Sequence, residues 1–270
     1  MFKSIVPITK ERHLKKKVRA TDNFDFIKDV HIASIMVHEF SRASSVYPIV
    51  FLEDQAEDRF RPVVLTGLEE GENLFIKDNK WEASYIPAII RRYPFALART
   101  GEDGRYTVCI DEESVFVNEE EGESLFTEDG EAGEVIDRVK QYLTELQQME
   151  IFTTEFCKFM SKNNMFTPLN MKVRVGSEVK NISGAYVINE DRFNALSDEK
   201  FIELRAKKYI SVIYAHLSSL AQIERLIEFQ DKRRQIERLV EFQDKRRRNG
   251  ASSQKKTELE SAKKDDKEKK

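Results

Sequence analysis

The hydrophobic positions between Glu134 and Asn163 follow the period of an α-helix. Apolar side chains recur there at spacings of three and four residues, and the segment contains neither proline nor glycine. The pattern predicts one long helix, which would measure roughly 45 Å at a rise of about 1.5 Å per residue. Asn163, Asn164 and Pro168 supply its stop signals.

Shorter apolar runs before this helix are typical of strands. We expect strands at 3–8, 47–52, 63–68, 73–76, 95–99 and 105–110, the last two joined by a glycine-containing turn at 100–104. The polar segment EDQAEDRF (53–60) is expected to be a surface loop. The spacing of apolar residues in His31–Ser44 predicts a helix capped by Asp29.

The chain after the long helix is predicted to form a hairpin and then helices. The hairpin would join 171–175 to 179–188 around Gly176-Ser177, and the helices would cover 199–206 and 209–220. Strands first and helices later, in mixed order, predict an α+β fold. Its strands would be mainly antiparallel and lie in the N-terminal half, followed by the long central helix and the C-terminal helices.

A tandem repeat lies near the C-terminal end. Residues 222–234 (QIERLIEFQDKRR) and 235–247 (QIERLVEFQDKRR) differ only at Ile227 and Val240. A shift by one repeat length rotates the apolar stripe by roughly 220°, so the two copies cannot use one face of a straight helix. We therefore predict a body at 1–229, a duplicated basic helical extension at 230–249 and a disordered lysine-rich tail at 250–270. A basic amphipathic helix for a membrane or a partner is the alternative.

Charge is unevenly distributed along the 270 residues, whose formal net charge is −3. The net charge is −8 up to Ala221 and +5 from Gln222 onward, and many acidic residues gather between Glu102 and Glu134. An acidic body repels phosphates, so no nucleic-acid partner is expected. The acidic stretch lacks the D-x-D-x-D-G order of a calcium loop, which favours a solvated surface over a cation site.

No apolar run approaches the roughly 18 residues that a membrane span needs, so no transmembrane segment is expected. The first residues, MFKSIVPITKERHLKKK, lack the apolar core of a signal peptide, which predicts a cytoplasmic location by default. A surface or envelope association would then need a signal-independent route. The two cysteines, Cys109 and Cys157, exclude a disulfide scaffold, and we expect both to be buried and inert.

The sequence contains no recognisable catalytic or metal-binding motif. The four histidines (His13, His31, His38 and His216) lack chelating spacing, and we expect them to be solvated or to cap helices. The Ser-nucleophile, phosphate-loop and dinucleotide motifs are missing as well. We therefore predict no metal site, no cofactor and no catalytic residue, and favour a protein without enzymatic activity.

The segment Trp81–Leu97 (WEASYIPAIIRRYPFAL) is chemically the most unusual. It holds the only tryptophan, a twin arginine and two prolines, which would present side chains from turns or short helical pieces. Arginines at this density could bind a carboxylate or a phosphate, and neighbouring aromatic rings could stack on a ligand. The ligand-binding candidates are Arg91, Arg92, Tyr85, Trp81 and Tyr93, with Asp111 and Glu112 as nearby carboxylates capable of acid–base chemistry. The alternative is that Trp81, Tyr93 and Phe95 belong to the core and that the arginines pair with Asp111 or Glu112.

Seven blocks, in order along the chain, resemble the SapC family of bacterial proteins. They are IVPITKERH (5–13), EFSRASSVYPIVF (39–51), GENLF (71–75), Trp81–Leu97, CIDEES (109–114), EGESLF (121–126) and YAHLSSL (214–220). The resemblance extends to about Phe229, so the second copy of the repeat and the tail depart from the family pattern. It does not extend to the peptide-transport permeases of similar name, which span membranes.

The resemblance implies a link to a paracrystalline surface layer, after which the family is named. Its members tend to be encoded beside outer-membrane receptors and tryptophan-halogenase-like enzymes, which implies an accessory role in uptake or modification. It supplies no catalytic residues. Two hypotheses follow: a non-enzymatic binding or assembly protein with a partner in the cell envelope, or a protein that binds or modifies a small anionic, carboxylate- or amino-acid-like ligand.

Overall fold

The computed structural model describes residues 1–100, 105–175 and 178–243. Over these residues the chain is α+β, as predicted, and all of its paired strands are antiparallel. The chain divides into two compact units, Met1–Ile227 and a second that begins at Glu228. Residues 222–227 of the first unit and 228–243 of the second are helical. The predicted tail at 250–270 and the end of the predicted extension lie outside the described residues, as do the turn residues 101–104 and 176–177.

The predicted long helix is confirmed as α4 (Glu134–Lys162). It ends where Asn163 caps it and Asn164 takes a positive φ of 54°, a left-handed conformation that asparagine tolerates better than most residues. Pro168 lies beyond this stop, inside the next strand.

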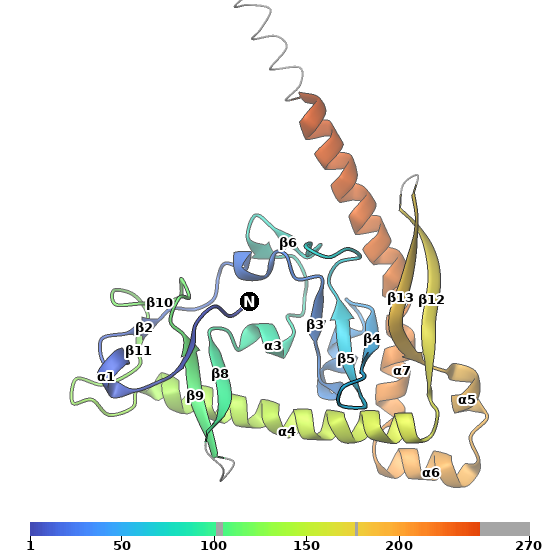
Figure 1. Cartoon of the computed structure of the whole chain (residues 1–270), viewed down its shortest axis with the longest axis horizontal. Coiled ribbons are helices and arrows are strands. Elements are labelled where there is room, and N and C mark those ends of the chain that lie inside the picture. The colour runs from blue at the N-terminus through green and yellow to red at the C-terminus, as the bar shows by residue number, and fades with distance from the viewer. Residues whose placement is uncertain (101–104, 176–177, 244–270) are drawn as a thin grey trace, which may run out of the picture. The chain divides into compact units, whose positions relative to one another are not determined.

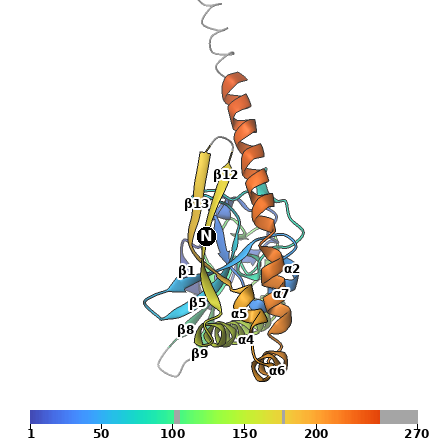
Figure 2. The ribbon, with the colours of Figure 1, turned by 90° about the vertical axis from the view of Figure 1, so that its right-hand side faces the viewer.

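Two sheets of the first unit lie along α4 (Figure 1). The first has the strand order β1-β9-β8 and the second the order β12-β13-β4-β5-β3. Both sheets contact the helix, through β8 and β5 respectively, and the view along α4 in Figure 2 shows both strands beside it. These strands are β1 (Ile5–Pro7), β3 (Ile32–Ser34), β4 (Ile49–Asp54), β5 (Arg59–Leu65), β8 (Phe95–Thr100), β9 (Arg105–Asp111), β12 (Phe166–Val175) and β13 (Glu178–Ile188).

Short strands and short helices lie in the segments that connect the strands of the two sheets. The short strands are β2 (Lys17–Val18), β6 (Ile76–Lys77), β7 (Lys80–Trp81), β10 (Val117–Asn118) and β11 (Glu123–Ser124). The short helices are α1 (Lys10–His13), η1 (Asp25–Ile27), η2 (Val37–Glu39), α2 (Phe40–Ala43) and α3 (Ala88–Arg91). The C-terminal helices are α5 (Glu190–Asn194), α6 (Asp198–Ala206), whose N-cap Ser197 accepts a bond from the Lys200 amide, and α7 (Ile210–Ser219).

The core on the first sheet's side of α4 is mostly aliphatic, and the core on the second sheet's side contains several aromatic rings. Toward the first sheet, Leu143 and Leu146 of α4 belong to a cluster with Phe95 and Ile110. Toward the second, Phe51 stacks on Phe156 of α4. Because α4 supplies apolar side chains to both cores, it joins the two sheets into one unit.

The predicted helix at His31–Ser44 is wrong. Ile32, Ala33 and Ser34 instead form β3, which pairs with Leu65, Val64 and Val63 of β5. Only the end of the segment is helical, as η2 and α2. The apolar spacing fits this strand followed by helical turns equally well, and pairing with a distant strand decides the outcome.

The predicted loop at 53–60 is also too long. The hairpin of β4 and β5 continues through it, with Asp54 opposite Arg59, so only 55–58 connect the strands. Arg59, Phe60 and Arg61 therefore lie on a strand.

None of the helices in the described part of the chain is both long and apolar enough to cross a membrane.

Candidate functional site

Trp81 and Tyr85 belong to a buried polar cluster centred on Glu39. The Glu39 carboxylate is 5 % exposed and accepts three hydrogen bonds, from the Tyr85 hydroxyl (2.6 Å), the Ala88 amide (2.7 Å) and the Met36 amide (2.9 Å). The Trp81 indole donates to the Tyr85 carbonyl oxygen at 3.1 Å. These bonds hold η2 to the start of α3 and use the indole N–H of Trp81 and the hydroxyl of Tyr85.

Asp111 and Tyr93 are likewise used by the fold. Asp111 is fully buried, and its carboxylate accepts bonds from the amides of Lys3 (3.0 Å) and Ser4 (2.9 Å) and from the Tyr93 hydroxyl (3.2 Å). The Tyr93 ring stacks on Phe26 with centroids 4.1 Å apart. Asp111 thus anchors the N-terminal segment to β9.

Glu112 lies against two side chains of α1 and forms an ion pair with Arg12. Its carboxylate lies 2.6 Å from the Arg12 Nη2 and 3.1 Å from the His13 Nε2. The alternative in which Arg91 or Arg92 pairs with Asp111 or Glu112 is therefore wrong, because both carboxylates have other partners. His13 and His216 are fully buried, so the expectation of solvated histidines is wrong for both; the Nδ1 of His13 accepts a bond from the amide of Thr9, the N-cap residue of α1, at 3.1 Å.

The twin arginines point to different surroundings. Arg91 is exposed, donates from Nε to the Ile86 carbonyl oxygen at 3.0 Å, and lies over the rings of Tyr85 and Tyr142. Arg92 is partly buried and lies over the Phe2 ring, with Cζ 5.6 Å from the centroid. The Nε of Arg92 is buried and has no hydrogen-bond partner among the described residues.

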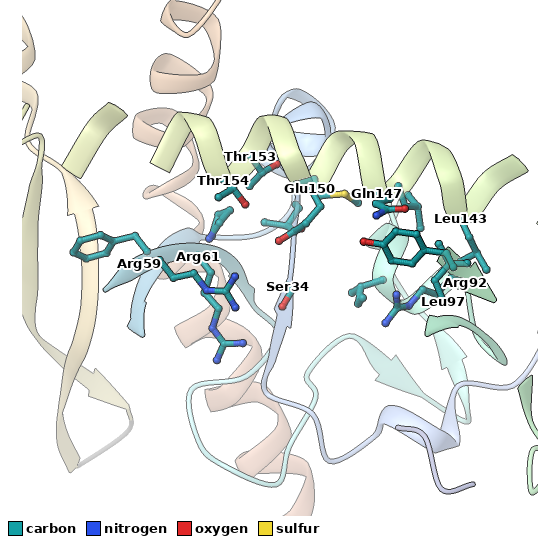
Figure 3. Close-up of a pocket in the computed structure, with 17 residues that line it drawn as sticks. Ser34, Arg59, Arg61, Arg92, Leu97, Leu143, Gln147, Glu150, Thr153 and Thr154 are labelled. Carbon is teal, nitrogen blue, oxygen red and sulfur yellow. The ribbon is translucent and has the colours of Figure 1, made fainter. Parts of the chain in front are cut away.

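A cavity of about 370 Å³ lies between α4 and the two sheets (Figure 3). We call it the α4 cavity. Its polar lining residues are Ser34, Arg59, Arg61, Arg92, Tyr106, Gln147, Glu150, Thr153 and Thr154. Its apolar lining residues are Ile35, Met36, Phe60, Pro62, Ile89, Leu97, Leu143 and Leu146. Both its size and its mixed lining are typical of a site for a small organic molecule.

Positive charge dominates the lining of the α4 cavity. Arg59 forms an ion pair with Glu57, Nε to Oε2, at 2.8 Å. Arg61 is exposed and forms no ion pair within the described part of the chain. Burial lowers the pKa of the Arg92 guanidinium, an effect that Tyr142 and the carboxylate of Glu150 oppose. Glu150 is the one acidic residue of the lining.

A second cavity, of about 230 Å³, shares Arg92 and Leu143 with the first. Arg91 and Tyr93 also line it, together with Arg19 and Tyr142. The predicted candidates Arg91, Arg92 and Tyr93 therefore meet around this smaller space, and Arg92 alone among them also faces the α4 cavity. Trp81, Tyr85, Asp111 and Glu112 line neither cavity.

Arg59, Arg61, Glu150 and Ser34 were not predicted as site residues. Arg59 fell within the predicted surface loop and Arg61 just before a predicted strand, and Glu150 fell within the predicted long helix. The alternation of Arg59, Phe60 and Arg61 was the available signal, because residues two apart on a strand share a face.

Burial keeps the side chains of Cys157 and His216 in their neutral forms. Burial raises the pKa of the Cys157 thiol to about 12, so the thiol stays protonated near neutral pH. Burial lowers the pKa of His216 to about 3, which keeps its ring neutral. Within 1–100, 105–175 and 178–243, no three His, Cys, Asp or Glu side chains gather as metal ligands would.

Comparison with known proteins identifies one family. A family model described as SapC matches residues 8–226, which is most of the chain. No curated protein and no solved structure matches it.

Proposed function

The chain belongs to the SapC family, and from that premise, together with the chemistry of the α4 cavity, we propose that it is a non-enzymatic binding protein for a small organic anion. The anionic group would contact Arg92, and the hydrocarbon part would lie against the apolar lining. Arg92, which the sequence already singled out, has the central role in this proposal.

The observation that carries the proposal is Arg92, a partly buried arginine that lines the α4 cavity and whose Nε has no hydrogen-bond partner among the described residues. A desolvated donor that makes no hydrogen bond costs free energy, and a charged one costs more. A ligand carboxylate in the cavity would pair with the charge of this guanidinium through a charge-assisted bond. Loss of this cost on binding would favour the complex.

Binding is favoured over catalysis by the positions of the carboxylates. Asp111 and Glu112, the candidates for acid–base chemistry, are held by Ser4 and by Arg12 outside the cavity. The α4 cavity itself presents mostly guanidinium, amide and hydroxyl groups, which bind and orient an anion. An enzyme that modifies such an anion is the alternative, and it would be supported by a turnover that depends on Arg92.

The family resemblance extends the proposal to the cell envelope. The protein would serve as an accessory to surface-layer assembly or to outer-membrane uptake, carrying its ligand or contacting an envelope protein. Affinity purification from the native host, followed by mass spectrometry, tests this part. Recovery of envelope proteins is the expected result, and recovery of metabolic enzymes alone would contradict it. The cytoplasmic location stays a prediction, which fractionation of the same cells would check.

Isothermal titration of the full chain with heptanoate tests the cavity. We expect heptanoate to bind and 1-heptanol, which lacks the charge, to bind at least about tenfold more weakly. Arg92→Gln should weaken heptanoate binding by about tenfold, and Arg92→Lys, which keeps the charge without the Nε, should have an intermediate effect.

The matched control is Arg42→Gln, because Arg42 is exposed and does not line the cavity. It should leave heptanoate binding unchanged. Equal affinities for heptanoate and heptanol, or an Arg92→Gln variant that binds like the wild type and melts normally, would overturn the proposal.

A further inference from the structure

The α4 cavity carries positive charge on two opposite walls. On one wall, Arg59 and Arg61 project from the same face of β5. On the other, Arg92 follows the last residue of α3. The strand β3, which carries Ser34, pairs with β5 and also contacts α3, so it separates the two arginine-bearing elements.

The helix α4 contributes one negatively charged residue, Glu150, to the lining of the cavity. Glu150 extends from α4 into the same cavity (Figure 3). Arg92 lines this cavity as well, and the carboxylate of Glu150 opposes the lowering of the Arg92 pKa by burial. Glu150 is exposed, which leaves the carboxylate accessible to a ligand that enters from solvent.

The net charge that a ligand meets follows from these contacts. Arg59 is neutralised by Glu57. Arg61 and Arg92 then contribute two positive charges and Glu150 one negative charge. A complementary ligand has the reverse arrangement: two anionic groups and one cationic group, with a net charge of −1.

We infer that the ligand is an α-amino dicarboxylate whose two carboxylates are separated by an apolar spacer, an assignment that rests on the proposed function of the cavity. The α-carboxylate binds Arg92, the ammonium group binds Glu150, and the distal carboxylate binds Arg61. The spacer lies against apolar side chains of the lining, Ile35, Met36 and Leu146 among them.

Simpler ligands satisfy fewer of these groups. A dicarboxylate without an amine leaves Glu150 without a cation and adds a repulsive contact. An amino acid with an apolar side chain leaves Arg61 without an anion. Each difference removes one charged interaction, which is worth about a factor of ten in affinity.

Calorimetric titration of the full chain with three matched compounds tests the inference. The probes are 2-aminopimelate, pimelate, which lacks the amine, and 2-aminoheptanoate, which lacks the distal carboxylate. We expect 2-aminopimelate to bind about tenfold more tightly than either of the others. Glu150→Gln should abolish the preference over pimelate, and Arg61→Gln should abolish the preference over 2-aminoheptanoate.

Two variants serve as controls. Glu155→Gln changes an exposed residue of α4, the helix that carries Glu150, and Glu155 does not line the cavity. Arg42→Gln removes the charge of an exposed arginine of α2 that does not line the cavity either. Both should keep the full order of affinities. Circular dichroism and thermal melting of every variant verify that the fold is intact.

The outcomes separate this inference from the proposed function. If pimelate binds as tightly as 2-aminopimelate, or if Glu150→Gln keeps the preference, the amino dicarboxylate is excluded while the anion site stands. If none of the three compounds binds, and heptanoate does not bind either, the anion site itself is excluded.

Discussion

The cluster around Glu39 and the cavity around Arg92 use charge in opposite ways. Glu39 is buried with three hydrogen-bond donors directed at its carboxylate. Arg92 is partly buried, yet its Nε has no partner in the described part of the chain. The two regions are adjacent, because Met36 both donates to Glu39 and lines the α4 cavity.

This difference separates groups that the fold uses from groups that it leaves available. A buried charge whose hydrogen bonds are complete stabilises the folded state and offers nothing to a ligand. A charge that is desolvated without a partner costs stability, and a ligand can recover that cost. Functional residues are therefore expected among the second kind, and substitutions of the two kinds should differ in their effect on stability.

The largest effect is expected for Glu39→Ala. Loss of the Glu39 carboxylate leaves the Met36 and Ala88 amides and the Tyr85 hydroxyl without their acceptor. The free energy of unfolding should therefore fall by roughly 4 kcal/mol. Urea denaturation followed by circular dichroism measures this change. A loss below about 1 kcal/mol would show that water replaces the carboxylate and that the cluster is not a structural element.

The two copies of the repeat offer the next test, with a matched pair of leucines. Leu226 in the first copy is 1 % exposed, and Leu239, its equivalent in the second copy, is 62 % exposed. Leu226→Ala should lower the free energy of unfolding by roughly 3 kcal/mol, whereas Leu239→Ala should change it by less than about 0.5 kcal/mol. Denaturation of both variants under one set of conditions gives the comparison. Equal losses would contradict the proposed boundary of the body near Phe229.

A pH titration tests the tyrosine next to the Glu39 cluster. Tyr47 is fully buried, donates to the Tyr85 carbonyl oxygen and accepts from the Trp81 indole. Burial raises the pKa of its hydroxyl above the usual value near 10. The folded state therefore releases this proton later than the unfolded state. The contribution of Tyr47 to the free energy of unfolding is therefore complete below pH 10, the pKa of the unfolded state. It falls as the pH rises further, and about 1 kcal/mol of it is lost by pH 11.

Tyr47→Phe isolates this contribution. At pH 7 the variant should be less stable by about 1 kcal/mol, because both hydrogen bonds of the Tyr47 hydroxyl are lost while the Trp81 indole keeps the Tyr85 carbonyl oxygen as its acceptor. Between pH 9 and 11 the gap between variant and wild type should close. Urea denaturation at each pH measures the gap, and two parallel curves would show that Tyr47 ionises freely in the folded protein.

The smallest effects on stability are expected at the arginines of the cavity. Arg61 forms no ion pair in the described residues, so Arg61→Gln should change the free energy of unfolding by less than about 0.5 kcal/mol. Arg92→Gln should be similarly neutral, because the charge removed is incompletely hydrogen-bonded. A loss of more than about 2 kcal/mol at Arg92 would place it with Glu39 among the groups that the fold uses.

Part of the site was predictable from the sequence. The density of aromatic and arginine residues in Trp81–Leu97 led to Arg92, which lines both cavities. The same density led to Trp81, Tyr85 and Tyr93, which the fold uses in hydrogen bonds and ring contacts. Composition alone cannot separate these roles, because a ring that packs in a core and a ring that stacks on a ligand have the same chemistry.

By itself, the sequence determined the α+β class, the length of α4 and the hairpin of β8 and β9. These features depend on the period of apolar residues and on stop signals that act over a few positions, as at Asn163 and Asn164. It also determined the family, through short blocks spread along the chain.

Only the tertiary structure decided that residues 32–34 pair with β5, that Arg61 and Arg92 line one cavity, and that Leu226 is buried while Leu239 is exposed. The repeat demonstrates the reason most directly, since two nearly identical segments have the same helical preference and different burial. Burial depends on which distant segment packs against a side chain, and that partner lies outside the local sequence.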